Sequence, residues 1–337
     1  MKIAIIGATG MIGHHAAAAA LAAGHQLRVI HREGSDVSRI ADLQQSGGDR
    51  FETAIGDLDD VDQMEAAFQG VDAVINCAAY YPTRPRNWRA EVAMATKQMQ
   101  LFYNACGLAD VDRIVYLGGA IALRRDPDGA PGTEAMEYDS PPSSTNSYVQ
   151  VKYAMHKQAL EAAHSGLPVV IGIPTMTLGE YDYGPSTGRF ITEVANRTMP
   201  GFVDGRRNVL YAGDSGRGLL LAAEKGRPGE AYLFSGTDIT MDELMTIIAR
   251  VAGVEKPKSV PLAAAKMLAR FQALRYRLFN GPVPKLGETA IAVMSAGQFI
   301  DGSKARNELG FEPTLSVEDA VRRAYDWFVA NGMIQST

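Results

Sequence analysis

The sequence has little cysteine, no long apolar run and no excess of charge of one sign. Its two cysteines, Cys77 and Cys106, lie far apart without flanking Cys or His, which argues against a disulfide framework or a structural zinc site. No apolar run approaches the ~20 residues that span a bilayer. The 33 Lys and Arg residues nearly balance the 38 Asp and Glu residues. We therefore expect no metal site, no nucleic-acid partner and no membrane attachment.

The composition is that of an ordinary globular protein, with 46% apolar and 21% charged residues in a chain of 337. This length suits roughly two domains. Lys2, a short apolar run and an alanine stretch imitate a secretory signal. Gly7 and Gly10 interrupt this apolar run, which is therefore shorter than the hydrophobic region of a signal peptide, about 7–15 residues. The sequence therefore indicates a cytoplasmic protein.

The first half of the chain alternates short apolar runs with helix-like stretches. Continuous apolar runs are typical of parallel strands that helices cover on both faces, and the alternation predicts right-handed crossovers. The predicted fold is α/β, a Rossmann-like doubly wound parallel sheet with about six strands before residue 175. The expected strands are Ile3–Ile6, Leu27–Ile30, Phe51–Ile55, Ala73–Cys77, Ile114–Leu117 and Val169–Ile173, and the expected helices span about 11–23, 37–45, 60–69, 88–107 and 148–165.

Two later segments break this rhythm. Residues 120–147 are rich in Pro, Gly and Asp, which predicts a long functional loop or lid. After Pro174 the alternation stops, and glycines divide 175–210, which predicts a smaller irregular C-terminal lobe. Further helices are expected at Met241–Val251 and at 316–330, the latter capped by Ser316.

The residues after the first apolar run predict a nucleotide site. Gly7, Gly10 and Gly13 give the spacing G-x-x-G-x-x-G between a buried strand and an alanine-rich helix. Such glycines let the backbone approach a pyrophosphate, and the helix N-terminus attracts its charge. The alternative is a tight turn without a ligand. The residues expected at the cofactor here are Gly7, Thr9, Gly10, Met11, Ile12 and Gly13.

The end of the second strand distinguishes the two dinucleotides. A carboxylate there would bind the ribose 2′-hydroxyl of NAD, but the sequence reads His31-Arg32, with Glu33 one step later. The planar donor fork of Arg suits a 2′-phosphate, so NADP is favoured. The alternative is a solvated Arg32 with Glu33 on the ribose of NAD. The remaining predicted cofactor residues are Asp57 and Leu58 after the third strand, Ala78 and Ala79 after the fourth, and Pro174 after the sixth.

Tyr148 and Lys152 stand four residues apart, on one face of a predicted helix. An ammonium group beside a phenol favours the phenolate and lowers its pKa, so this tyrosine could exchange a proton with a substrate oxygen while hydride moves at a nicotinamide. Tyr153 and Lys157 have the same spacing, so spacing alone does not choose between the pairs. A purely structural helix is the other interpretation.

These residues together resemble the extended short-chain dehydrogenase/reductase superfamily, in its dihydroflavonol 4-reductase-like and nucleoside-diphosphate-sugar epimerase branch. The resemblance implies a Rossmann domain that binds NAD(P), a C-terminal lobe that shapes the substrate pocket, and Tyr148 with Lys152 as the catalytic pair. The motifs that carry it are GATGMIG, Asp57-Leu58, Asn76 to Ala79, Tyr148-x-x-x-Lys152, Gly166 to Val170, Asp214, Lys304, Leu309 to Phe311, and Pro313.

The sequence departs from this family at Gly119. The family places a Ser or Thr after the fifth strand to hydrogen-bond the substrate oxygen, and Gly119 falls at that position. Loss of such a donor costs a factor of ~100–1000 in rate. Either another hydroxyl substitutes, or the glycine makes room for a bulkier substrate, or catalysis is altered or lost. The candidate substitutes are Ser143, Ser144, Thr145, Ser147, Tyr80 and Tyr81.

The leading hypothesis is an NAD(P)-dependent oxidoreductase that acts on a carbonyl or secondary alcohol of a small-molecule substrate. The first alternative is a nucleoside-diphosphate-sugar epimerase or dehydratase that keeps its cofactor bound. The second is a non-catalytic NADP(H) sensor. We expect 1–174 to bind the cofactor, completed by part of 211–240, and 175–337 mainly to bind substrate. A homodimer is expected through the apolar helix from Trp88 to Gly107, and His14 and His15 are interpreted as packing or capping residues.

Overall fold

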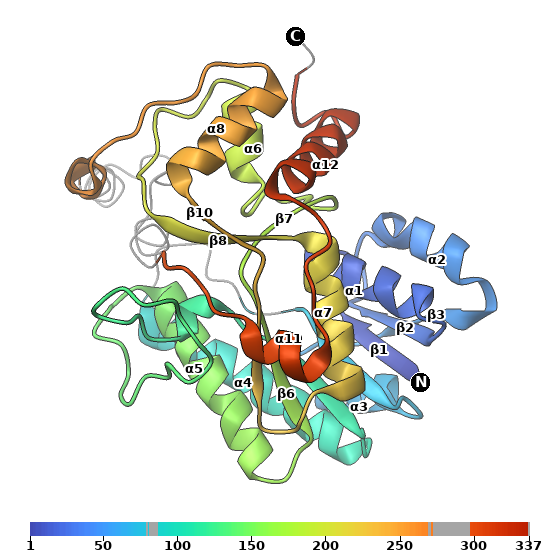
Figure 1. Cartoon of the computed structure of the whole chain (residues 1–337). Helices are drawn as coiled ribbons and strands as arrows, with labels where there is room; N and C mark the ends of the chain where they lie inside the picture. Colours follow the sequence, from blue (N-terminus) through green and yellow to red (C-terminus); the bar gives the residue numbers. More distant parts are fainter. Residues whose placement is uncertain (79, 81–86, 269–270, 272–296, 336–337) are drawn as a thin grey trace.

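The computed structural model describes residues 1–78, 80, 87–268, 271 and 297–335. A seven-stranded sheet with the order β3-β2-β1-β4-β5-β6-β9 forms its centre, and every neighbouring pair is parallel (Figure 1). The strands are β1 Lys2–Ile6, β2 Gln26–His31, β3 Phe51–Ile55, β4 Ala73–Asn76, β5 Arg113–Leu117, β6 Val169–Pro174 and β9 Ala231–Phe234. The predicted α/β class and all six predicted strands are confirmed.

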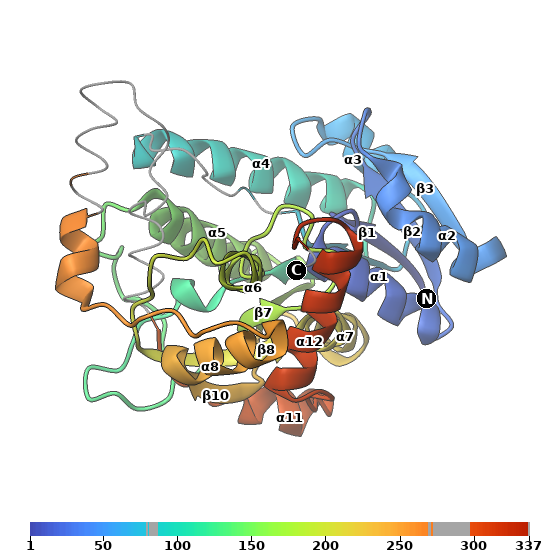
Figure 2. The same ribbon diagram turned by 90° about the horizontal axis from the view of Figure 1, so that it is seen from above.

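Helices cover both faces of this sheet, as Figure 2 shows from above. One apolar core joins the sheet to α3 (Val61–Phe68), α4 (Trp88–Leu108) and α5 (Ser147–His164). A second core joins the opposite face to α1 (Met11–Ala22), α7 (Ala212–Lys225) and α11 (Ser303–Leu309). Burial on both faces explains why the strands read as continuous apolar runs.

The helix expected at 37–45 is wrong in detail. The chain forms a 3-10 turn, η1 (Val37–Ile40), before α2 (Ala41–Gly47), and a second short turn, η2 (Gly48–Arg50), precedes β3. The side chain of Asp36 accepts a hydrogen bond from the backbone N–H of Ser38, at 3.2 Å, and caps η1. This local side-chain bond competes with the regular helical pattern that periodicity alone would suggest.

The C-terminal part is more regular than its glycines suggest. β7 (Met176–Leu178), β8 (Arg206–Tyr211) and β10 (Thr237–Thr240) form a three-stranded sheet of the order β10-β8-β7. A third apolar core joins it to α6 (Arg189–Ala195), α8 (Met241–Ala252) and α12 (Val317–Ala330). The predicted cap of α12 is confirmed, because Ser316 Oγ accepts from the N–H of Asp319 at 3.1 Å.

The connections place the candidate site at one edge of the central sheet. The order of the strands reverses between β1 and β4, and ligands of open α/β sheets bind outside the carboxyl ends of the strands at such a switch point. The predicted long loop follows β5 and holds a short turn, η3 (Ala120–Ala122), and a parallel β-bridge between Gly132 and Ile300 before α5 begins. Along the described part of the chain, no helix is both long and apolar enough to cross a bilayer.

Candidate functional site

The glycine turn after β1 is formed by close contacts that exclude side chains. Gly7 has a φ of +85°, and a Cβ there would lie 2.9 Å from the backbone nitrogen of Ala78. A Cβ on Gly13 would collide with the carbonyl oxygen of Gly7. The N–H of Gly10 donates to that same oxygen at 3.0 Å. The turn therefore brings β1, β4 and α1 together through their backbones.

This turn fits the pyrophosphate of a dinucleotide. Gly10 is the N-cap of α1 and has no side chain that could accept the N–H groups of the first helical turn. Met11 and Ile12 occupy that turn and are half-buried, as is Thr9. An unblocked helix N-terminus with backbone on three sides is the arrangement that binds phosphate groups.

The predicted adenosine end lies along β2 and β3. Arg32 and Glu33 directly follow β2 and are both exposed, whereas His31 is half-buried. Asp57 and Leu58 follow β3 and are half-buried, next to β2 in the sheet. Both Arg32 and Glu33 are thus accessible to a ligand at this edge.

The predicted nicotinamide end lies at β4 and β6. The N–H of Ala78 donates to Asn76 Oδ1 at 3.0 Å, which fixes the turn after β4. Ala79 lies outside the described residues. Pro174 is buried at the end of β6, and the hydroxyl of the next residue, Thr175, donates to Asn208 Oδ1 on β8 at 2.8 Å. This bond connects the end of β6 to the second sheet.

Tyr148 and Lys152 lie in the first turns of α5. The side chain of Asn146 caps this helix and accepts the backbone N–H groups of Tyr148, at 3.0 Å, and Val149, at 3.2 Å. Gln150 Nε2 donates to the carbonyl oxygen of Pro142 at 2.7 Å, so the long loop holds the same end of the helix. Tyr148 is half-buried. One turn later, Lys152 Cδ lies 3.9 Å from a Cβ placed on Gly119, so this end of α5 lies beside the residues that follow β5.

Lys152 is buried, with 7% of its surface exposed. Burial lowers the pKa of its ammonium group to about 8, because the charged form loses hydration. The charged form of Lys152 is therefore destabilised by burial, at a position beside Gly119, which follows β5. The rival pair differs in environment, since Lys157 is half-exposed and forms an ion pair with Glu137 at 3.6 Å.

The backbone does not require glycine at position 119. Gly119 has the extended values φ −156° and ψ 135°. Among the residues that the structure describes, a Cβ there would meet only Lys152, at 3.9 Å from Cδ and 4.0 Å from Cε. Gly118 is different, because its Cβ would lie 3.1 Å from Ile171 Cγ2 and from Ile173 Cγ1. Within the described part of the chain, a side chain at position 119 would therefore meet no atom closer than ordinary van der Waals contact with Lys152.

The hydroxyl groups considered as substitutes have different surroundings. Ser144 Oγ accepts the N–H of Asn146 at 3.2 Å and keeps its own proton as a donor. Tyr80 donates its hydroxyl proton to the buried carboxylate of Glu91. Ser143 and Thr145 are exposed, Ser147 is half-buried, and Tyr81 lies outside the described residues. Ser144 is thus the loop hydroxyl whose position is fixed by the helix cap.

Comparison with known proteins supports these expectations about fold and chemistry. Residues 3–234 match the model of the NAD dependent epimerase/dehydratase family. The chain belongs to this family. It is an enzyme of the extended short-chain dehydrogenase/reductase type that depends on a nicotinamide cofactor, NAD or NADP.

Three relatives illustrate the range of the family. A crystal structure described as a nucleoside-diphosphate-sugar epimerase from Pseudomonas aeruginosa is 43% identical, with a TM-score of 0.86 over 99% of both chains. Sterol demethylase protein B of Methylococcus capsulatus is 28% identical over 99% of this chain and 100% of that protein. A putative dihydroflavonol 4-reductase of Synechocystis is 26% identical over 98% of this chain and 96% of that protein.

Proposed function

We propose that the protein transfers hydride between a nicotinamide cofactor and a carbonyl or secondary alcohol, with Tyr148 as the acid/base and Lys152 as its partner. Bound NAD(P) would supply the hydride chemistry. The observation that carries the proposal is the position of the pair: Tyr148 begins a capped helix beside the end of β5, and Lys152 is buried one turn later. The residues proposed to hold the cofactor are those named above at the ends of β1, β2, β3, β4 and β6.

The roles of the two side chains follow from their chemistry. Tyr148 donates its phenolic proton to the carbonyl oxygen during reduction and takes it back during oxidation. The Lys152 ammonium stabilises the phenolate by Coulomb attraction, which burial strengthens because little water screens it. The open space beside Gly119 accommodates a substituent of the substrate, and the Ser144 hydroxyl is the proposed donor to the substrate oxygen.

NADP is the proposed form of the cofactor, because exposed Arg32 stands where a 2′-phosphate would lie. We further propose that 1–174, completed by part of 211–240, holds the cofactor, and that most of 175–337 shapes the substrate site. The strand order supports this division, since β9 is the last strand of the central sheet, whereas β7, β8 and β10 form a second sheet. A cytoplasmic site of action remains part of the proposal.

A second candidate, a nucleoside-diphosphate-sugar epimerase or dehydratase, is favoured by a cavity that contains more arginines than carboxylates. This cavity of about 400 Å³ is lined by Arg125, Arg206 and Arg207 and by two carboxylates, Asp128 and Asp204, among others. Burial and the charge of Arg125 lower the pKa of Arg207 to about 10, although Asp204 opposes the shift. Neighbouring cations in one cavity suit a diphosphate. Arg207 adjoins Asn208, which bonds Thr175 at the end of β6.

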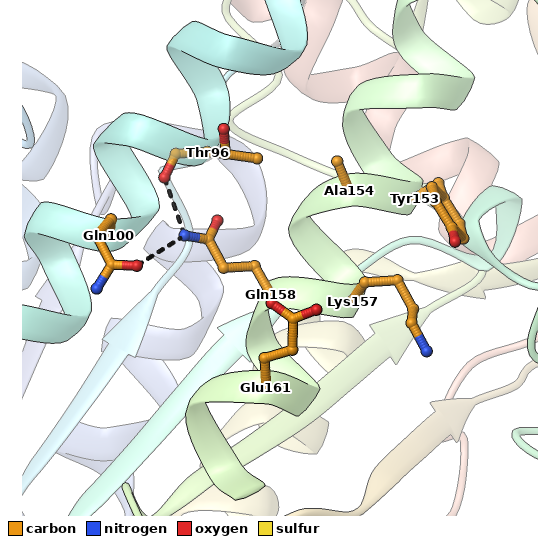
Figure 3. A pocket seen from close by; sticks show the side chains of 7 residues that line it. All are labelled: Thr96, Gln100, Tyr153, Ala154, Lys157, Gln158 and Glu161. Atoms are coloured by element: carbon orange, nitrogen blue, oxygen red, sulfur yellow. Dashed lines mark hydrogen bonds between the residues drawn. The ribbon is translucent and has the colours of Figure 1, made fainter. Parts of the chain in front are cut away.

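We also propose a homodimer through α4 and α5. A groove of about 370 Å³ runs between these helices, and Gln158 of α5 crosses it by donating to the carbonyl oxygen of Thr96 on α4 at 3.0 Å (Figure 3). On α4, Met94 and Leu108 are exposed by 43% and 61%. Burial of these side chains against a second copy would remove apolar surface from water. Light scattering on the purified protein tests the proposed homodimer, because it measures the mass of the particle in solution.

Turnover tests the function. The purified protein is incubated with NADPH or NADP and a panel of ketones, secondary alcohols and nucleoside-diphosphate sugars. A reductase changes the absorbance of the reduced nicotinamide stoichiometrically, whereas an epimerase or dehydratase converts a sugar nucleotide with no net change. We expect Tyr148→Phe to lower kcat at least about 100-fold in either case, because the proton donor is lost.

The matched control is Tyr153→Phe, which alters the tyrosine of the rival pair on the same helix. This variant should keep its activity. Tight NADP(H) binding without turnover of any substrate, together with no effect of Tyr148→Phe, would instead support the sensor alternative.

A further inference from the structure

A loop of the C-terminal part reaches the cofactor side of the central sheet. It follows β7 and contains Tyr181, which has a φ of +67°. A bulky residue in the left-handed region is strained and persists only where the surroundings enforce that conformation. The contacts of its side chain supply that enforcement, and they are directed at α1 and α2 rather than at the catalytic pair.

Tyr181 and His14 hold one carboxylate from two sides. The two rings stack, with centroids 3.5 Å apart and planes inclined by 17°. The Tyr181 hydroxyl donates to Asp42 Oδ2 at 2.8 Å, and His14 Nε2 lies 3.0 Å from Asp42 Oδ1. Burial lowers the pKa of His14, so its ring is neutral at neutral pH and Nε2–H is the donor. Asp42, on α2, is thereby fixed by both α1 and the loop.

A second contact fixes the same segment nearby. The guanidinium of Arg39, on η1, lies over the ring of Tyr183, 4.3 Å from its centroid. Tyr183 in turn packs edge-on against Trp327 of α12, with centroids 4.9 Å apart. Arg39 also pairs with Asp36 at 3.2 Å. Two tyrosines of one loop therefore contact η1 at Arg39 and the start of α2 at Asp42, three residues further along the chain.

The segment held in this way is the one that continues from Arg32. The N–H of Ser35 donates to the carbonyl oxygen of Arg32 at 3.1 Å, and Asp36 then caps η1. Hydrogen bonds within the segment thus link Arg32 to the turn that carries Arg39 and precedes Asp42. Tyr183 contacts Arg39, and Tyr181 contacts Asp42. A segment fixed before binding loses less conformational entropy when a ligand arrives.

We propose that Tyr181 and Tyr183 are positioning residues for the adenosine end of the cofactor: they hold the segment 32–42 so that Arg32 meets the 2′-phosphate. This inference rests on the proposed use of NADP. It gives the C-terminal part a role in cofactor binding, and it assigns a purpose to the strained backbone of Tyr181.

Calorimetric titration with adenosine 2′,5′-bisphosphate and with 5′-AMP tests the proposal without a substrate. We expect Tyr181→Phe, which removes the bond to Asp42, to raise the Kd for the bisphosphate at least about fivefold while the Kd for AMP changes less than about twofold. Tyr211→Phe is the matched control. It removes a hydroxyl that donates to Glu180 at 3.4 Å in the same inter-sheet region but does not touch 32–42, so it should leave both constants unchanged.

A double-mutant cycle separates positioning from a general structural role. Arg32→Ala should abolish the preference for the bisphosphate, and Tyr181→Phe should then have no further effect in that background. Equal losses for both ligands, or additive effects of the two substitutions, would overturn the positioning role while NADP use stands. If Arg32→Ala leaves the preference intact, the proposed use of Arg32 fails, and the positioning inference fails with it.

Discussion

Glycines stand at both ends of the candidate site, and the structure constrains them differently. In the turn after β1, Gly7 and Gly13 are required because backbone atoms occupy the space of a side chain. After β5, Gly119 has an extended backbone, and among the described residues only the Lys152 side chain lies within 4 Å of a Cβ placed there. Backbone contacts therefore require glycine at the proposed cofactor end, whereas at the proposed substrate end no described backbone atom requires it.

The largest effect should come from Gly13→Ala. Its Cβ would overlap the carbonyl oxygen of Gly7, and backbone cannot yield as a flexible side chain can. We expect a loss of about 3 kcal/mol or more in the free energy of unfolding, measured by urea denaturation of the apoprotein. Gly10→Ala is the control, since its Cβ would lie 3.5 Å from the same oxygen, and it should cost under about 1 kcal/mol. Equal losses would contradict the steric explanation.

Lys152→Met tests how much the buried ammonium group of Lys152 destabilises the folded protein. The folded-state pKa of about 8 lies below the ordinary 10.5 of lysine, so folding disfavours the charged form. This cost, on the order of 3 kcal/mol, is present in full below pH 8 and disappears as the pH rises toward 10.5. The apo variant should therefore be more stable than the parent at pH 7, with a difference that shrinks toward pH 10. A difference that does not depend on pH would refute this account.

The smallest effects should distinguish two adjacent glycines. Gly118→Ala places a Cβ 3.1 Å from two isoleucines of β6 and should cost about 1 kcal/mol. Gly119→Ala should change the free energy of unfolding by less than about 0.5 kcal/mol. Thermal denaturation of both variants measures the contrast, and a more harmful change at Gly119 would mean that its space is not open.

The substitution Gly119→Ser tests the role of the space beside Gly119 in catalysis. Its hydroxyl would stand beside Lys152, where a donor could reach the substrate oxygen. Because Ser144 already supplies the proposed donor, we expect the Ser and Ala variants to turn over substrate at similar rates. A Ser variant at least about tenfold faster than the Ala variant would indicate that the parent lacks this donor.

The fold was predictable where one local property sufficed. Burial on both faces of the sheet requires apolar strands, so the six runs were recognisable. Ser316 could be assigned because a helix cap involves residues only three apart. β9 joins the sheet next to β6 from a distant part of the chain, and nothing within its own residues specifies that partner. The same holds for the three strands of the second sheet.

The candidate site divides in the same way. The spacing of Gly7, Gly10 and Gly13 and the pair Tyr148 and Lys152 are local patterns, each within one turn or one helix. By contrast, the sequence predicts only a packing or capping role for His14, and no pattern marks Tyr181. Their contact with Asp42 joins three segments distant in the sequence. No local signal could have identified it.

The amino-acid order alone set the alternation of elements, the glycine turn and the facing phenol and amine of α5, because each depends on neighbours within a few positions. Tertiary structure alone decided that Lys152 is buried, that Gly119 faces open space, and that a loop beyond β7 holds the segment after β2. Burial, free volume and contacts between remote segments are properties of the assembled chain, since they depend on which surfaces meet when the sheets and helices pack.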